Sequence, residues 1–134
     1  MEPSTITTLN HLAHQSHAGE LHFGYLIGRL MELGVESYRV DYRLGSTDYF
    51  LPSGAAHTVQ FPPSSVPIAE SLDAGALKEC IRGAQRGEVR YPHFVEQSRA
   101  AGVVGYVVWI AGRHVVYFGR RGEQHVEHFP SAST

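Results

Sequence analysis

The chain has 134 residues, of which 43% are hydrophobic and 18% are charged, and its formal net charge is −2. This length and composition fit one globular domain with a sizeable core and exclude a disordered chain. The small net charge gives no reason to expect a nucleic-acid partner or an anionic membrane surface, and no apolar run approaches the roughly 18 residues that a membrane helix needs.

The cellular compartment is predicted from two features of the chain. Cys80 is the single cysteine, so no intrachain disulfide can form. The first residues, MEPSTITTLN, lack the basic segment and apolar run of a signal peptide. We therefore expect a cytoplasmic protein.

The first half of the chain, residues 5–62, predicts two helices. Leu9 and Leu12 lie on the apolar face of the first helix, which Gly19 ends. The second helix carries Phe23, Leu26, Leu30 and Leu33 on one face and ends before Gly34.

Three short strands follow in residues 34–62. Tyr38, Val40 and Tyr42 point to one face of the first strand, and the residues between them are charged. Glycine-containing turns separate the strands, which predicts an antiparallel meander covered by the helices on its apolar face.

A linker rich in proline and serine, residues 63–72, leads to a second half with the same pattern, residues 73–130. Its first helix is capped by Ser71 or Asp73, and its second helix begins near Pro92 and ends before Gly102. Three more strands follow.

The two halves align without a gap, which indicates an internal duplication. Identical residues at equivalent positions include Leu9/Leu77, Gly19/Gly87, Glu20/Glu88, Gly34/Gly102, Tyr38/Tyr106, Val40/Val108, Tyr49/Tyr117, Phe50/Phe118, His57/His125 and Phe61/Phe129. We predict an α+β fold built from a tandem duplication of an ααβββ unit. The two units are expected to pack as one compact, pseudo-symmetric domain over residues 1–134.

The halves differ in their first strands. Arg39 and Asp41 of the first half correspond to Val107 and Trp109 of the second, so the segment YVVWI is apolar on both faces. A strand of this kind is expected to be covered on both sides, by the N-terminal helix or by the first half. Alternatively, Val107 and Trp109 form the interface of a homodimer.

Candidate ligand-binding residues are the tyrosines and histidines that both halves retain: Tyr38, His57, Tyr106 and His125. One interpretation is structural, with the tyrosines in the core and the histidines holding turns through backbone hydrogen bonds. The other is a small-molecule site between the halves, lined by these four residues. The same two interpretations apply to Tyr49 and Tyr117, which both halves also retain.

No pattern in the chain predicts a metal or another cofactor. His11, His14 and His17 are spaced along the first helix, but the run contains no acidic residue and is interpreted as a solvated face. No phosphate loop, nucleotide-binding glycine motif or nucleophile elbow is present. The leading hypothesis is a non-enzymatic module that binds a protein or a ligand, and the alternative is a small-molecule-binding protein or enzyme.

The second half also resembles a known family. The stretch YPHFVEQSRAAGVVGYVVWIAGRHVVYFGRRGEQHVEHFP is similar to the bacterial YdfO-like proteins, a family of unknown function often labelled "phage envelope protein". The matching features are Phe94, residues 101–103, Tyr106, the turn at 117–122 and the closing Phe-Pro at 129–130. The resemblance implies an α+β fold and no particular catalytic residues. Its label implies a phage-linked regulatory or structural protein as a further alternative.

Overall fold

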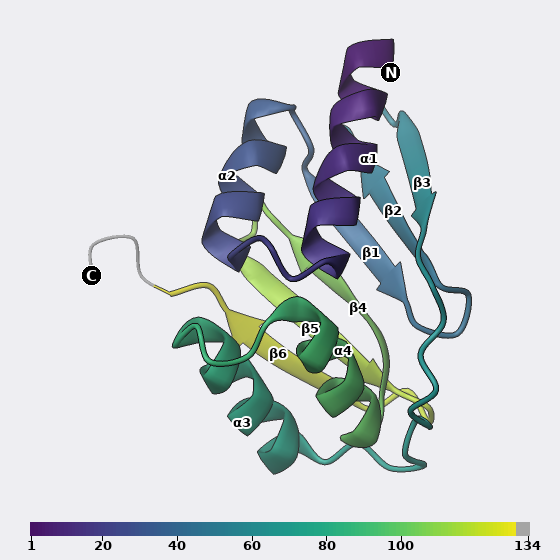
Figure 1. Ribbon diagram of the computed structural model, residues 1–134, viewed down its shortest axis with the longest axis vertical. Coiled ribbons are helices and arrows are strands. Elements are labelled where there is room, and N and C mark those ends of the chain that lie inside the picture. Colours follow the sequence, from purple (N-terminus) through teal and green to yellow (C-terminus); the bar gives the residue numbers. More distant parts are fainter. Residues whose placement is uncertain (131–134) are drawn as a thin grey trace.

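The computed structural model describes residues 1–130 and contains four helices and six strands (Figure 1). The helices are α1 (Pro3–His17), α2 (Phe23–Glu32), α3 (Ala74–Gln85) and α4 (Tyr91–Ala100), and the strands are β1 (Ser37–Asp41), β2 (Ser46–Phe50), β3 (Ala56–Gln60), β4 (Val103–Trp109), β5 (His114–Gly119) and β6 (Gln124–His128). The order of elements is therefore ααβββ in each half. The predicted α+β class is confirmed.

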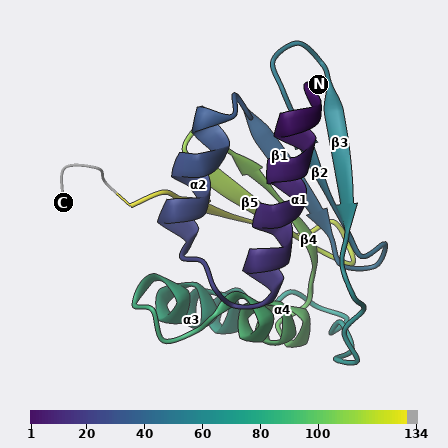
Figure 2. The same cartoon turned by 45° about the horizontal axis from the view of Figure 1, so that its top comes forward.

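All six strands belong to one antiparallel sheet in the order β3-β2-β1-β4-β5-β6. Each half contributes a three-stranded meander, and pairing of β1 with β4 joins the two meanders at the centre of the sheet. The four helices lie on one side of the sheet, as Figures 1 and 2 show. The described part of the molecule thus has two layers, with its core between them.

Local sequence signals account for the ends of α3 and α4. Asp73 caps α3, because its carboxylate accepts a hydrogen bond from the backbone N–H of Ala76 at 3.0 Å. The sequence left open whether Ser71 or Asp73 plays this role. Gly102 follows α4 with φ of 97°, and a Cβ at this position would lie 2.3 Å from the backbone oxygen of Ser71. Only glycine fits here.

The core lies between the helices and the sheet. The largest side chains with almost no exposure come from both halves: Leu9, Leu30, Leu77, Val103 and Val108. Leu9 and Leu77 occupy equivalent positions on α1 and α3, as the apolar helical pattern predicts. Burial of such side chains contributes roughly 1.5–3 kcal/mol each to folding.

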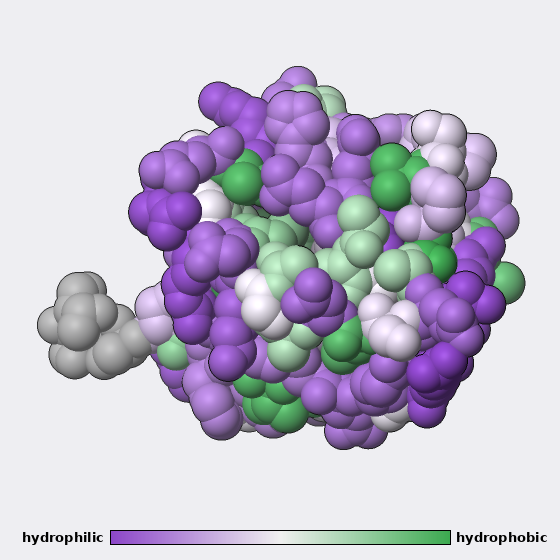
Figure 3. Space-filling model, turned by 90° about the horizontal axis from the view of Figure 1, so that it is seen from below, coloured by the Kyte–Doolittle hydropathy of each residue, from purple (hydrophilic) through white to green (hydrophobic). Residues whose placement is uncertain are grey.

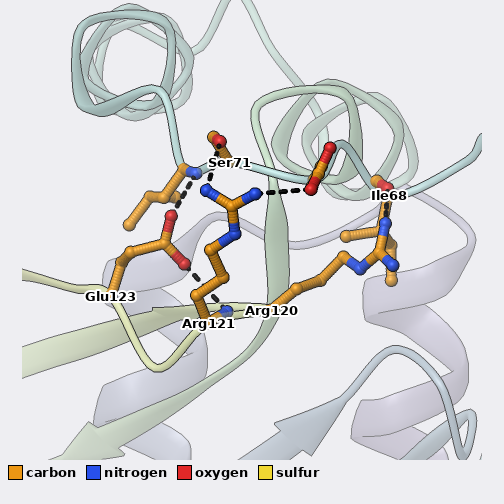
Figure 4. A network of polar contacts seen from close by, with 7 residues as sticks. Ile68, Ser71, Arg120, Arg121 and Glu123 are labelled. Atoms are coloured by element: carbon orange, nitrogen blue, oxygen red, sulfur yellow. Dashed lines mark hydrogen bonds and ion pairs between the residues drawn. The ribbon is translucent and has the colours of Figure 1, made fainter.

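The linker between the halves is held by the turn between β5 and β6 (Figure 4). Glu123 accepts hydrogen bonds from the backbone N–H of Leu72 at 2.8 Å and from that of Arg121 at 2.9 Å. The Arg121 side chain donates to Ser71 at 3.4 Å and pairs with Glu70. These contacts anchor the end of the linker to the second half.

The face of the sheet away from the helices is open in residues 1–130. Trp109 is 45% exposed and Val126 is 46% exposed on this face. The expectation that β4 is covered on both sides is therefore wrong for Trp109, because neither α1 nor the first half reaches that face. We call this surface the open face.

The rest of the described surface is mixed. Seen from below, hydrophobic residues gather near the middle of the molecule and hydrophilic residues surround them (Figure 3). None of the helices in residues 1–130 has the length and hydrophobicity that a membrane span requires.

Candidate functional site

The helix-covered face of the sheet carries two rows of side chains that run across all six strands. The register places one row at His57, Tyr49, Tyr38, Val108, Val115 and Glu127. The neighbouring row is Val59, Thr47, Val40, Tyr106, Tyr117 and His125. Each row thus contains two tyrosines and a histidine from one half. The other half contributes two valines to each row, with Glu127 in the first row and Thr47 in the second.

These rows form the base of a cluster of buried tyrosines. Tyr38 and Tyr49 lie with ring centroids 5.7 Å apart, and the equivalent Tyr106 and Tyr117 lie 5.4 Å apart. Tyr91, from α4, covers the second pair and is hydrogen-bonded to Tyr106, with the two hydroxyl oxygens 2.6 Å apart. Aromatic pairs at these separations contribute to packing as well as to burial.

Three tyrosine hydroxyls in this cluster have no hydrogen-bond partner in residues 1–130. They belong to Tyr38, Tyr49 and Tyr117, which are only 4%, 4% and 6% exposed. In residues 1–130, every side-chain nitrogen or oxygen atom that is inaccessible to solvent has a hydrogen-bond partner. Because these three hydroxyls have none, each must be accessible to solvent. The same holds for the hydroxyl of Thr47, which is 6% exposed.

That accessible space is a cavity of about 340 Å³ between the helices and the sheet. Its inner wall includes the four residues with free hydroxyls and the aliphatic side chains that alternate with them, such as Val40 and Val108. Residues from both halves line it. A volume of this size lies at the lower end of the range of ligand pockets in proteins.

Two equivalent loops form the outer part of the cavity. They are the connections between α1 and α2, residues 18–22, and between α3 and α4, residues 86–90. The loops contact each other, because Arg90 donates a hydrogen bond to the backbone oxygen of Gly19 at 2.6 Å. His17, at the end of α1, stacks on Phe61 with ring centroids 4.4 Å apart.

The five buried tyrosines and the partly buried Tyr91 are neutral at physiological pH. Burial raises the pKa of Tyr38, Tyr42 and Tyr49 far above the ordinary value, and it does the same for Tyr91, Tyr106 and Tyr117. Each free hydroxyl therefore offers one donor and two acceptor positions and carries no charge.

One carboxylate, Glu127 on β6, lies on the cavity wall. Arg82 of α3 donates to it at 2.5 Å, and His125 lies 3.3 Å from its other oxygen. Burial favours the neutral carboxyl, but these two hydrogen bonds and the charge of Arg82 outweigh it and hold the pKa of Glu127 below its usual value. Its negative charge is thus compensated within the protein.

The structure separates the four predicted ligand-binding residues into two groups. Tyr38 and Tyr106 line the cavity, whereas His57 and His125 lie on the edge strands outside its lining. His57 is hydrogen-bonded to the side chain of Asn10 at 2.8 Å, and His125 contacts Glu127. The two histidines therefore contact side chains, and no hydrogen bond from either ring to the backbone is seen in residues 1–130.

Sequence reasoning missed Thr47 and Tyr91, neither of which is retained as an identical residue in the other half. Their location became visible only through the sheet register and the position of α4. Tyr49 and Tyr117 were noted as equivalent residues, and both line the cavity.

The residues predicted for a homodimer interface lie together on the open face. Val107 is partly buried and Trp109 is exposed. In the register, Val107 lies between Arg39 and Val116, and Trp109 lies between Ser37 and His114.

Three further histidines, His17, His22 and His128, line the cavity. His11 and His14 are exposed, whereas His17 turns toward Phe61. The described part of the chain contains no group of three or more side chains placed to hold a metal ion. Burial raises the pKa of the Cys80 thiol to about 11, which makes it a protonated core residue.

Comparison with known proteins places this arrangement in a family. Residues 11–127 match the model of a family described as "Protein of unknown function (DUF1398)". The chain belongs to this family. The DUF1398 match runs from α1 to β6, so it spans both halves and the whole cavity wall on the sheet. A search of curated proteins found no match.

Proposed function

We propose that the protein binds a small molecule in the cavity between its two halves. The observation that carries this proposal is the set of three tyrosine hydroxyls, on Tyr38, Tyr49 and Tyr117, that face the cavity without a partner in residues 1–130. A ligand that displaced water from such a hydroxyl without bonding to it would lose roughly 1–3 kcal/mol. Three such groups on one wall are more than packing requires, because phenylalanine would fill the same space.

Water satisfies these hydroxyls when the cavity holds no ligand. A ligand with matching polar groups replaces that water and gains apolar contacts with the rings and the aliphatic wall. We therefore assign the tyrosines to ligand recognition. The residues do not form a nucleophile with an adjacent base, so we propose a binding function without catalysis.

The proposal is tested by a calorimetric screen of the protein against common uncharged and charged metabolites. Ala84 lines the cavity from α3, so Ala84→Phe fills part of it. Ala76 is exposed on the same helix, so Ala76→Phe is the matched control. A compound that binds the parent protein and the Ala76→Phe variant but not Ala84→Phe supports the proposal. A compound that binds the Ala84→Phe variant as tightly as the parent protein would place the site elsewhere.

A second candidate function is self-association through the open face. Trp109 is exposed there, beside the partly buried Val107, Val116 and Phe118. The charges of the face are already compensated, because Arg39 and Asp48 pair at 2.8 Å. The partner is proposed to be a second copy of the chain.

The area of the open face suits such a dimer. Six strands about 4.8 Å apart, each about five residues long, give a surface of roughly 500 Å² per copy. Two copies would bury about 1,000 Å² in total, which is the lower limit for a specific interface. Apart from Phe50, the large apolar residues lie in the second half of the face, so two copies related by a two-fold axis can place these regions against each other.

Three finer assignments are proposals that do not depend on the cavity. We propose that the two halves arose by duplication, on the strength of their gapless alignment and repeated order of elements. The resemblance to the YdfO-like proteins supports that narrower family name, and with it a phage-linked role. The lone cysteine supports a cytoplasmic location.

A further inference from the structure

The charged groups of the cavity are confined to its rim or already paired. Glu20 and Arg90 lie in the two outer loops, and Arg90 is engaged with the backbone oxygen of Gly19. Glu127 is bound by Arg82. The rest of the sheet wall is tyrosine, threonine or valine, apart from His128 at its edge. Ser16, His17, His22 and Gln85 line the cavity from the helices and an outer loop.

The sheet wall therefore has hydrogen-bonding capacity, and its one carboxylate, Glu127, is already paired. An ionised group brought against Tyr38, Tyr49 and Tyr117 would lose its hydration and find neutral hydroxyls in its place. The resulting penalty is large in a low-dielectric site, unless an opposite charge is present. The tyrosines cannot supply that charge by ionising, because burial strongly favours their neutral forms.

The size and lining of the cavity set further limits on its ligand. A cavity of about 150 Å³ accommodates benzene in a protein interior. The volume of about 340 Å³ found here has room for roughly two rings. The free hydroxyls approach from both halves, with Tyr38 and Tyr49 on β1 and β2 and Tyr117 on β5.

We propose that the ligand is an uncharged, mainly apolar molecule of one or two rings that carries hydroxyl, carbonyl or amide groups. Its polar groups bind the hydroxyls of Tyr38, Tyr49 and Tyr117, and its rings pack on the aromatic and aliphatic wall. Hydroxyls both donate and accept, so they suit a ligand that offers both kinds of group. This inference rests on the proposed binding function and narrows its ligand class.

The test uses matched pairs of probes that differ in charge but hardly in shape. The pairs are benzamide and benzoate, indole-3-acetamide and indole-3-acetate, and 2-naphthamide and 2-naphthoate, each at millimolar concentration and pH 7.5. Binding is followed by NMR of protein labelled with ¹³C in its tyrosine rings. Tyr25, which is 50% exposed on α2, lies outside the cavity lining and serves as an internal reference.

The proposal predicts that at least one amide shifts the resonances of the cavity tyrosines and leaves Tyr25 unchanged. Its acid partner should bind at least tenfold more weakly. Tyr49→Phe should weaken binding of the amide by about threefold to tenfold, because it removes one hydrogen bond and keeps the ring. Tyr25→Phe is the control and should leave the affinity unchanged.

Two failures are distinguishable. Equal or tighter binding of an acid at the cavity tyrosines would overturn the uncharged-ligand inference and leave the cavity site intact. If none of the six probes moves any cavity tyrosine, the binding function itself fails.

Discussion

Arg39 and Val107 lie opposite each other at the centre of the β1–β4 pair, and they occupy equivalent positions in the two halves. On either side, Tyr38 pairs with Val108 and Val40 pairs with Tyr106, and these two pairs are equivalent when the halves are exchanged. Exchanging the halves therefore leaves the register unchanged. As a consequence, the tyrosines of both halves reach the same helix-covered face and form one cavity wall.

The free hydroxyls of the cavity predict an unusual stability pattern. Tyr49→Phe removes a hydroxyl without a protein partner, so the free energy of unfolding should change by less than about 0.5 kcal/mol. Tyr42→Phe breaks the hydrogen bond to Ser98, whose oxygen lies 2.7 Å away. This variant should lower the free energy of unfolding by about 1 kcal/mol. Urea denaturation measures both. A larger loss for Tyr49→Phe would mean that its hydroxyl has a partner within the protein.

The ion pair between Glu127 and Arg82 predicts a pH dependence of stability. The pKa of Glu127 is lowered in the folded state, so its stabilising effect is fully present above the unfolded value of 4.5 and is lost as the pH falls through the folded value. Glu127→Gln should therefore be less stable than the parent at pH 7, and the difference should shrink below about pH 4.5.

Chemical denaturation between pH 3 and pH 7 checks this prediction. The control is Glu88→Gln, since Glu88 pairs with Arg86 in an exposed position and such pairs contribute little. A stability difference for Glu127→Gln that stays constant across this range would contradict the assigned role of the carboxylate.

Self-association through the open face predicts a dependence on Trp109. Sedimentation equilibrium of the parent protein should show a dimer, and Trp109→Lys should shift it to a monomer by placing a charge at the interface. Tyr25→Lys changes an exposed aromatic residue on the helical side and should leave the dimer intact. A parent protein that remains monomeric at millimolar concentration would exclude the second candidate function.

The clamp on the linker predicts a local effect on hydrogen exchange. Glu123→Ala removes the acceptor of the Leu72 backbone N–H, so this amide should exchange faster. The neighbouring amide of Asp73 donates to the backbone oxygen of Ala101 at 2.8 Å and should be unaffected. Equal acceleration of both amides would indicate that the whole segment opens, rather than that a single contact is lost.

Much of the fold was accessible from the sequence because local signals and burial agree in this chain. The apolar residues Leu9 and Leu12 predict α1, in which both are buried, and Asp73 is one of the two predicted caps of α3. Alternation around Tyr38 and Val40 predicted β1 and its buried face. These patterns are short-range, so they can be found without knowing the partners of each element.

The pairing between the halves was not accessible in this way. Nothing in the sequence of β1 or β4 states that they pair with each other, and that pairing decides which face of β4 is covered. The double apolar pattern of β4 favours burial on both sides, whereas Trp109 lies on the open face. Hydrophobic patterning alone cannot distinguish an internal contact from a surface for another molecule.

The candidate site was partly predictable. Retention in both halves identified Tyr38 and Tyr106, which line the cavity, but it also selected His57 and His125, which lie outside the lining. An identical residue in both halves shows that two positions are equivalent, but it does not show whether they line the cavity. Thr47 escaped notice because its equivalent in the second half is Val115, which leaves no repeated residue to find.

The measurement that tests the central claim most directly is a crystal structure of the protein soaked with the amide probe that shifts the resonances of the cavity tyrosines most. The account predicts electron density for the compound in the cavity between the halves, with a polar atom within hydrogen-bond distance of the hydroxyl of Tyr38, Tyr49 or Tyr117. Density for the compound only outside the cavity, with the three hydroxyls bound to water, would contradict it.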